Sequence, residues 1–439
     1  MTFQALGVPN FRRFFGGQLG KLHGVWVMYV AQDWLVLNLS GNSATALGFV
    51  TALQFAPVVL LSLYGGQLAD RNDRRRLLIA VNSAAAALAL ALGVLVTTHL
   101  IALWMVYVFA ALLGAVNAIE NPVRQSFLSD LVEPGLLPNA LGLTSAAFNM
   151  ARVVGPAIAG VAIWLAGLGP VFLATSAAFL IAPLLLARIR PSDLYGIDAD
   201  GFGGYGHSPY GRGEHGPRKG VGEARIRDGI AYVWRREDLL LPLALLLVTG
   251  LAGYNFQLTL SVMAKKVFGT GAQQFGLLTT ALAVGALAGS LVSGARRSRP
   301  SVYAVLGSGT AFGLLETVAG LAPTFWTTAF LLVPTGFFMI FFAQATNQRL
   351  QLGVEPEYRG RVMALFVLVF MGTTPVGGPL VGFVSEHIGP RAGIWGGGMV
   401  CFAAALTALV WHLHRSGERL RVTLHPLPHL EVVPAPAQV

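Results

Sequence analysis

Cysteine and the usual signatures of enzymatic chemistry are almost absent from this sequence. Its one cysteine, Cys401, lies inside an apolar run, which excludes an intrachain disulfide and argues against redox chemistry. There is no Gly-Lys-Ser/Thr phosphate loop, so ATP is not expected to drive the protein. No cluster of histidine and cysteine has metal-ligand spacing, and no serine elbow or paired carboxylates point to catalysis. We therefore expect no cofactor, no metal and no enzymatic activity.

Charged residues are also scarce. They make up 11% of the chain, whereas soluble domains carry roughly 25%. Hydrophobic residues make up 54%, and the mean hydropathy is +0.64, which places the chain in a lipid bilayer. The net charge of +10 does not indicate nucleic-acid binding, because the basic residues are not gathered on one soluble face. They alternate with apolar runs, which predicts an integral plasma-membrane protein (a bacterial inner membrane) with both termini in the cytoplasm.

Twelve apolar runs are each long enough to cross a bilayer, which takes roughly 17–25 residues. The first six lie at about 17–39, 44–69, 77–97, 100–120, 138–165 and 169–189. The second six lie at about 239–263, 273–295, 301–322, 325–348, 361–385 and 389–413. This pattern predicts an all-α membrane protein with twelve transmembrane helices.

The two groups of runs repeat one another. The turn from Gly65 to Arg76 returns as Gly289 to Arg299, so that glycines, leucines and arginines recur at an offset of 223 residues. A dense block of charge cannot lie in lipid, so each copy is expected to be a turn at the membrane surface. An internal repeat at half the chain length is typical of a duplicated transporter. We therefore predict two pseudo-symmetric six-helix bundles.

These patterns divide the chain into four parts. They are the N-terminal bundle (1–190), a cytoplasmic linker (191–238), the C-terminal bundle (239–414) and a cytoplasmic tail (415–439). Within the linker, the Gly-rich residues 192–220 are expected to be disordered. Residues 223–238 have the spacing of an amphipathic helix that lies on the membrane surface. The tail contains several prolines and is expected to be unstructured.

Several motifs resemble the major facilitator superfamily. The turn Gly66 to Arg75 is similar to the signature of that superfamily between its second and third helices. The fifth run, Arg152 to Gly160, resembles the Gly-Pro motif associated with antiporters. The segments 31–35, 121–125 and 359–364 resemble the branch of enterobactin exporters and macrolide-efflux proteins, also called transmembrane secretion effectors.

The resemblance implies two sets of functional residues. The first set is a conformational latch that holds one state until a small change of charge releases it, formed by Gly66, Asp70, Arg71 and Arg74. The arginines of this turn are alternatively plain topological anchors. The second set packs helices closely at the interface between the two bundles, and consists of Gly155, Pro156, Gly160, Pro375, Gly378 and Pro379.

The chain departs from the superfamily pattern at three places. Asp73 stands where the signature has glycine, and Ser293 replaces the acidic residue in the second copy. The arginine that many drug antiporters carry in the fourth helix is missing, and that helix is expected to end at Glu120.

Ionisable residues within the apolar runs are candidates for proton coupling, because a charge at the bilayer centre costs at least about 2.5–3.5 kcal/mol. Asp33 is the first candidate proton carrier; the alternative is a permanently paired or capping carboxylate near the outer surface. Glu120 is a second candidate, but pairing with Arg124 one turn later is favoured. Arg152 is the third, with a structural bridge to Asp33 or Glu120 as its alternative. Of the other two, Lys21 is expected to reach the interface with its long side chain, and Glu316 to lie on a peripheral helix.

Uncharged polar residues in apolar runs are candidates to line a substrate cavity, with hydrogen bonding between helices as the alternative. They are Gln54, Asn149, Tyr254, Asn255, Gln257, Gln344 and Asn347.

Together these features predict a secondary active transporter that works by alternating access. It is expected to export a small amphipathic molecule, such as a drug or a siderophore-like compound, by proton antiport; export rests on the resemblance. The expected partners are the small-molecule substrate, protons and the lipid bilayer, with no nucleic acid and a monomeric state. One alternative is an importer or facilitator with the same fold, and another is a non-transporting membrane scaffold or sensor.

Overall fold

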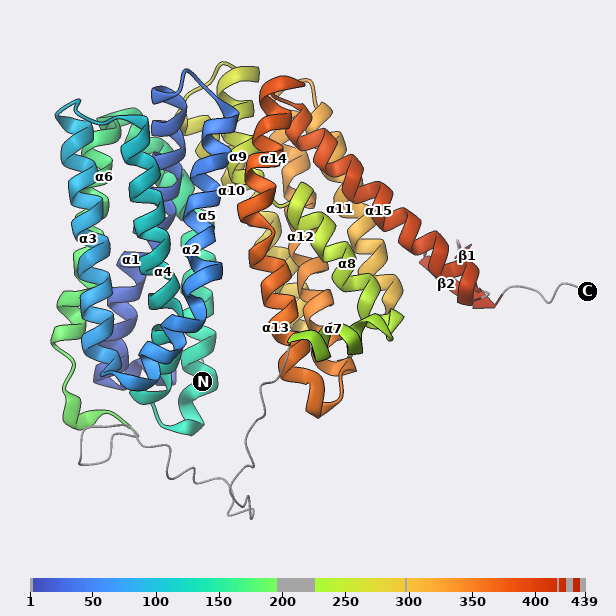
Figure 1. The fold of residues 1–439 in the computed structure, drawn as a ribbon, viewed down its shortest axis with the longest axis horizontal. Helices are drawn as coiled ribbons and strands as arrows, with labels where there is room; N and C mark the ends of the chain where they lie inside the picture. Colours follow the sequence, from blue (N-terminus) through green and yellow to red (C-terminus); the bar gives the residue numbers. More distant parts are fainter. Residues whose placement is uncertain (1–2, 196–225, 297, 417, 424–428, 435–439) are drawn as a thin grey trace, which may run out of the picture.

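The structure is a computed structural model that describes residues 3–195, 226–296, 298–416, 418–423 and 429–434. Eleven helices in these residues are long and apolar enough to cross a membrane. The helix α1 (Pro9–Leu39) is not among the eleven, because charged and polar residues such as Lys21 and Asp33 are spread along it. Figure 1 shows the first half of the chain on one side of the molecule and the second half on the other.

The first half consists of long helices joined by short turns. Its elements are η1 (Gln4–Gly7), α1, α2 (Ala44–Arg71), α3 (Arg74–Thr97), α4 (Leu103–Leu131), η2 (Pro134–Leu136), α5 (Leu137–Ala166), α6 (Leu168–Ala187) and η3 (Pro191–Asp193). Side chains cap two of these helices: Ser43 accepts a hydrogen bond from the Ala46 N–H, and Asp73 accepts one from the Arg76 N–H. Such caps satisfy backbone donors that a helix start leaves free, which fixes where α2 and α3 begin.

The second half has the same plan with broken helices. Its elements are α7 (Ile226–Trp234), α8 (Glu237–Ala252), α9 (Phe256–Val262), η4 (Met263–Val267), α10 (Ala272–Ala295), α11 (Val302–Leu321), α12 (Phe325–Gly353), α13 (Pro356–Gly372), α14 (Thr374–His387) and α15 (Ala392–Ser416). The break between α8 and α9 falls at Gly253. The N–H groups of Gly253 and Tyr254 both donate to Thr249 O, at 2.8 Å and 2.9 Å respectively. The break between α13 and α14 falls at Thr373, shortly before a proline that has no N–H to continue the ladder.

Helix pairs recur between the halves. In the first half α2 packs on α4 and α3 packs on α6; in the second half α10 packs on α12 and α11 packs on α15. These pairs stand in corresponding positions of the sequence repeat. The largest apolar core runs across both halves, and includes Trp34 and Phe275, whose rings stack with centroids 6.4 Å apart.

Three sequence-based expectations were wrong in detail. The fourth helix does not end at Glu120 but continues to Leu131, because Pro122 lies inside α4 without stopping it. The start of the predicted disordered linker forms η3, and residues 196–220 lie outside the described residues. In the tail, β1 (Glu418–Thr423) pairs antiparallel with β2 (His429–Pro434), where no structure was expected. The predicted amphipathic helix is present as α7, and residues 223–225 of it lie outside the described part.

Candidate functional site

The two halves meet tightly at one end of the molecule, which we call the latch face; it carries Ser43 and Glu386. Here α2 packs on α14, and α5 packs on α10 (Figure 1). The backbones come so close that a methyl group at Gly160 would lie 2.8 Å from Ala272 O, and one at Gly276 would lie 2.4 Å from Pro156 O. Small residues are what such a close approach requires.

Of the other packing residues predicted from the sequence, Gly378 and Pro379 lie at the contact between the halves. A methyl group at Gly378 would lie 3.2 Å from Gly48 O, and Pro379 lies against Gly48 as well. Gly155 faces α1 instead, where a methyl group would lie 2.5 Å from Trp26 Cβ. Pro375 begins α14 just after the helix break.

Polar contacts also join the halves at the latch face. Glu386 Oε2 accepts a hydrogen bond from the Ala44 N–H at 2.5 Å, at the start of α2, and Glu386 Oε1 lies 3.7 Å from Lys266 Nζ. Lys265 donates a hydrogen bond to Asn38, and its ammonium lies over the Trp34 ring, 4.9 Å from the centroid. A carboxylate at a helix N-terminus is favoured by the helix dipole, so Glu386 links α14 to α2 both by charge and by hydrogen bonding.

At the opposite end, which we call the arginine face because it carries Arg74 and Arg299, the halves separate. A cleft of about 480 Å³ lies between α5 and α10. It is lined by Gly142, Ser145, Ala146, Asn149, Met150, Val153, Val154, Leu287, Ser290 and Leu291. Asn149 therefore lies in the cleft, where its side chain donates to Ser145 O at 2.9 Å.

The signature turn lies at the arginine face. Arg74 binds both carboxylate oxygens of Asp130 at 2.8 Å, which ties the turn to α4 of the same half. Asp70 is exposed, and in the described residues neither a hydrogen bond nor an ion pair is found for it. Arg71 is exposed too, and a methyl group at Gly66 would meet open space.

A buried charge cluster joins α1 to α4. Lys21 Nζ lies 2.8 Å from Glu120 Oε1, and Arg124 Nε lies 3.2 Å from the same oxygen. The favoured pairing of Glu120 with Arg124 is therefore found, with Lys21 as a second partner. The expectation that Lys21 reaches the membrane interface was wrong, because its side chain is only 6% exposed. A buried carboxylate needs such partners to remain charged.

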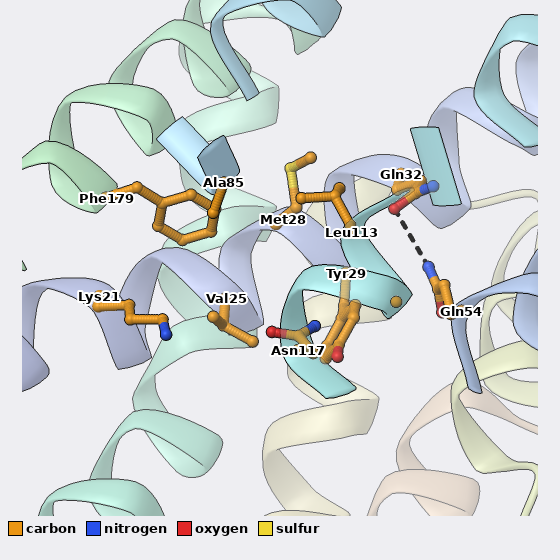
Figure 2. A pocket seen from close by; sticks show the side chains of 11 residues that line it. Lys21, Val25, Met28, Tyr29, Gln32, Gln54, Ala85, Leu113, Asn117 and Phe179 are labelled. Atoms are coloured by element: carbon orange, nitrogen blue, oxygen red, sulfur yellow. Dashed lines mark hydrogen bonds between the residues drawn. The ribbon is translucent and has the colours of Figure 1, made fainter. Parts of the chain in front are cut away.

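Figure 2 shows a small cavity beside this cluster, into which Lys21, Tyr29 and Asn117 project. Its far wall is Gln54, which donates to Gln32 Oε1 at 3.1 Å. Gln54 on α2 thus forms a hydrogen bond with α1 of the same half, which is the alternative given above for the polar residues in apolar runs.

Asp33 is buried within α1 and is 1% exposed, so it does not face lipid. The side chain against its carboxyl is that of Gln257, which comes from α9 in the other half. Within the part of the chain that the structure describes, one carboxylate oxygen, Oδ2, has no hydrogen-bond partner. Asp33 therefore lies where the two halves touch, with incomplete polar contacts.

Arg152 faces the other half from α5. Its side chain is half-buried. The expected bridge from Arg152 to Asp33 or Glu120 is absent from the described residues, where Glu120 binds Lys21 and Arg124 instead.

The remaining polar candidates are placed differently from one another. Tyr254 donates to Met339 O at 3.1 Å, and Asn255 donates to Leu251 O at 3.0 Å, so both hold the break of this helix. Gln344 is exposed on α12, and Asn347 accepts from Gln351 at 2.7 Å.

Two functional candidates were missed by sequence reasoning. The first is Glu386, whose only sequence signal is that it is an acidic residue next to a short turn. Its contact with α2 depends on how two helices that are distant in the sequence meet. Glu316 was expected to lie on a peripheral helix, yet its side chain is 2% exposed, and Oε2 has no hydrogen-bond partner among the described residues.

Comparison with known proteins places this geometry in a family. The family model described as "Transmembrane secretion effector" matches residues 2–194 and 212–434. The Staphyloferrin A transporter of Staphylococcus aureus is 26% identical over 86% of this chain and 89% of that transporter. Macrolide efflux protein A of Streptococcus pyogenes is 21% identical over 87% of this chain and 90% of that protein.

A solved structure has the same fold. It is a bacterial homologue of the human lysosomal transporter Spinster in an inward-facing, unoccupied conformation, with a TM-score of 0.69 and 15% identity over 91% of this chain and 94% of that one. The sequence-based resemblance is confirmed, since the family model covers most of both halves. The chain belongs to the transmembrane secretion effector family of the major facilitator superfamily.

Proposed function

We propose that this protein is a secondary active transporter that exports a small amphipathic molecule from the cytoplasm by proton antiport. The observation that carries this proposal is the asymmetry of the contact between the halves. They touch at the latch face and separate at the arginine face, with Asp33 and Arg152 between them. A transporter that alternates between two faces has this form in one of its two states.

The proposed architecture has twelve transmembrane helices, with α1 as the twelfth, in two six-helix bundles. The arginine face lies in the cytoplasm, as the positive-inside rule requires, together with both termini. The state described is then the inward-facing one. The fold shared with an inward-facing transporter supports this assignment.

Asp33 is the proposed proton carrier. Contact with Gln257 at the closed face shields it from water, and separation of the halves at that face would hydrate it. Water stabilises the ionised form of a carboxyl group, and burial favours the neutral form. Asp33 would therefore take up a proton from outside when the latch face is open, carry it as the neutral acid into the inward-facing state, and release it to the cytoplasm as cargo binds.

The proposed cargo is a lipophilic drug, a macrolide-like compound or a siderophore. The similarity to a staphyloferrin A transporter and to a macrolide efflux protein supports this class. The cleft at the arginine face is lined largely by apolar side chains with a few polar groups such as Asn149, which suits an amphipathic molecule. Arg152 supplies a cation for an acidic group of such a molecule.

The proposed latch of the alternate state is formed at the arginine face by Gly66, Asp70, Arg71 and Arg74. Asp70 is exposed in the described state, so it is free to reach a basic group or helix N-terminus of the other half. Arg74 already holds the turn in place through Asp130.

Transport into inverted proteoliposomes tests the proposal. With an acidic lumen, a labelled macrolide or staphyloferrin A should accumulate inside and release protons from the lumen. Asp33→Asn should abolish this accumulation, while Asp193→Asn, an exposed carboxylate far from the site, should leave it unchanged. Accumulation that does not depend on the pH gradient, or that is unchanged in Asp33→Asn, would contradict proton antiport. Accumulation only in right-side-out vesicles would identify an importer.

A further inference from the structure

Glu316 is a carboxyl group inside the second half. It lies on α11, which packs against α15, α12 and α8, and is 2% exposed. The charge cluster of the first half has no counterpart here, because in the described residues no ion pair or hydrogen bond is found for Glu316, and its Oε2 has no partner.

The surroundings of this carboxyl are built from small and apolar groups. A methyl group at Gly253 would lie 2.9 Å from Glu316 Oε2, from Cys401 Sγ and from Phe312 Cε1. A methyl group at Gly397 would lie 3.7 Å from Glu316 Oε1. Because Gly253 and Gly397 have no side chain, they leave space for the carboxyl group, which lies beside the break between α8 and α9.

Among the described residues, no cation is paired with this carboxyl to keep it charged. The ionisable groups that face it are Tyr254 from the break and Cys401 from α15. The only ionisable residue of α12 is Arg349, which donates to Pro300 O at 2.7 Å near the arginine face. A bare carboxylate within a bilayer is costly, so Glu316 is neutral and carries a proton in this state.

The position of Glu316 connects it to the part of the molecule that moves. Tyr254 directly follows Gly253, the glycine against which the Glu316 carboxyl packs, and the nearest cation of the other half on this side is Arg152 of α5. Tyr254 also packs edge-on against Phe312, with ring centroids 5.5 Å apart. A change of charge at Glu316 would therefore act on the α8–α9 break and, through Tyr254, on the contact between the halves.

We propose that Glu316 is a second proton-binding site of this transporter, located in the second half. It takes up a proton when the change of state opens the α8–α9 break to water, carries it as the neutral acid in the described state, and releases it to the cytoplasm as cargo binds. A proton is favoured over a metal cation, because the atoms around the carboxyl are a thiol sulfur, a ring edge and glycine backbone, which do not form an oxygen cage. This proposal rests on the proposed function for its role in transport, although proton binding itself does not.

Infrared difference spectroscopy on the full chain in lipid tests proton binding without any substrate. A pH step should change two protonated-carboxyl bands in the wild type. Glu316→Gln, which keeps the shape of the neutral acid, should remove one band and leave the other, and Asp33→Asn should do the reverse. Asp193→Asn is the matched control and should leave both bands. If Glu316→Gln leaves the carboxyl bands unchanged, or if its band responds to sodium rather than to pH, the proposal is overturned.

A second measurement places the site in the transport cycle. In the proteoliposome assay, Glu316→Gln should lower the number of protons released per macrolide by about twofold, because one of two carriers is lost. An unchanged ratio, with a lost infrared band, would overturn the role in coupling while proton binding stands. If no wild-type protons are released at all, the proposed antiport fails, and the infrared result still decides whether Glu316 binds a proton.

Discussion

At the scale of single residues, charge inside this protein is held in two ways. Lys21, Glu120 and Arg124 neutralise one another between α1 and α4. Asp33, Arg152 and Glu316 are buried or half-buried without an ion pair in the described residues. Paired charges stabilise a structure once it is formed, whereas unpaired ones remain free to take up a proton or an ionic ligand. This difference separates the structural residues from those that we propose to act in transport.

Substitution of Lys21 and substitution of Glu120 should lower the free energy of unfolding by different amounts. Glu120→Gln leaves Lys21 buried without a counter-charge and should lower the free energy of unfolding by about 3–5 kcal/mol. Lys21→Met should cost less, because Glu120 keeps Arg124 at 3.2 Å. The double variant should regain much of the loss of Glu120→Gln, which unfolding in a detergent titration would measure. Simple addition of the two single effects would contradict the proposed pairing.

Arg152 should matter only for cargo that carries an acidic group. A hydrogen bond to a charged group is worth about 1.5–3 kcal/mol, so Arg152→Gln should weaken the binding of an acidic substrate about 10- to 150-fold. Binding of a cationic macrolide should change little, and equilibrium binding of both compounds to the purified protein would compare them. Equal losses for the two compounds would show that Arg152 acts through the structure rather than on the cargo.

At the scale of elements, the contact between α5 and α10 depends on small residues. Gly276→Ala places a methyl group 2.4 Å from Pro156 O, a backbone atom that cannot turn away. Such overpacking costs about 1–3 kcal/mol, so the population with a closed latch face should fall about 5- to 150-fold relative to the other state. Labelling of a cysteine at Ser145, which lines the cleft, should slow as the cleft closes.

The matched control for this variant lies on the same helix. A methyl group at Gly294 would meet open space, so Gly294→Ala should leave the labelling rate unchanged. Slower labelling in the control as well would indicate a general effect on α10 and not the close contact with α5.

Sequence patterns were sufficient for the elements but not for the contacts between them. Eleven of the twelve apolar runs match helices long and apolar enough to cross a membrane, because a bilayer forces each crossing to be long, apolar and helical. The end of α4 was misplaced because the apolar run stops at Glu120, whereas the helix continues through Pro122 to Leu131. The pairing of Lys21 with Glu120, the contact of Glu386 with α2 and the burial of Glu316 join residues far apart in the chain, so no local pattern predicts them.

At the scale of the whole molecule, the two faces should carry opposing latches. Glu386 holds the latch face together through the Ala44 N–H of the other half, whereas Asp70 at the arginine face is exposed. A contact present in only one state stabilises that state, and its loss shifts the population to the other. Glu386→Gln should therefore favour the state that is open at the latch face, and Asp70→Asn should favour the state described above.

Distances between spin labels test this opposition directly. One pair of labels, at Asn42 and His387, spans the latch face, and another, at Ser145 and Leu291, spans the cleft. In Glu386→Gln the first distance should lengthen as the second shortens. In Asp70→Asn the cleft should stay open even in the presence of a substrate that closes it in the wild type. Losing a cap of this kind costs about 1 kcal/mol, which changes the ratio of the two states about fivefold. Shifts of the same sign in the two variants would mean that the faces are not coupled, and alternating access would then lose its structural basis in this protein.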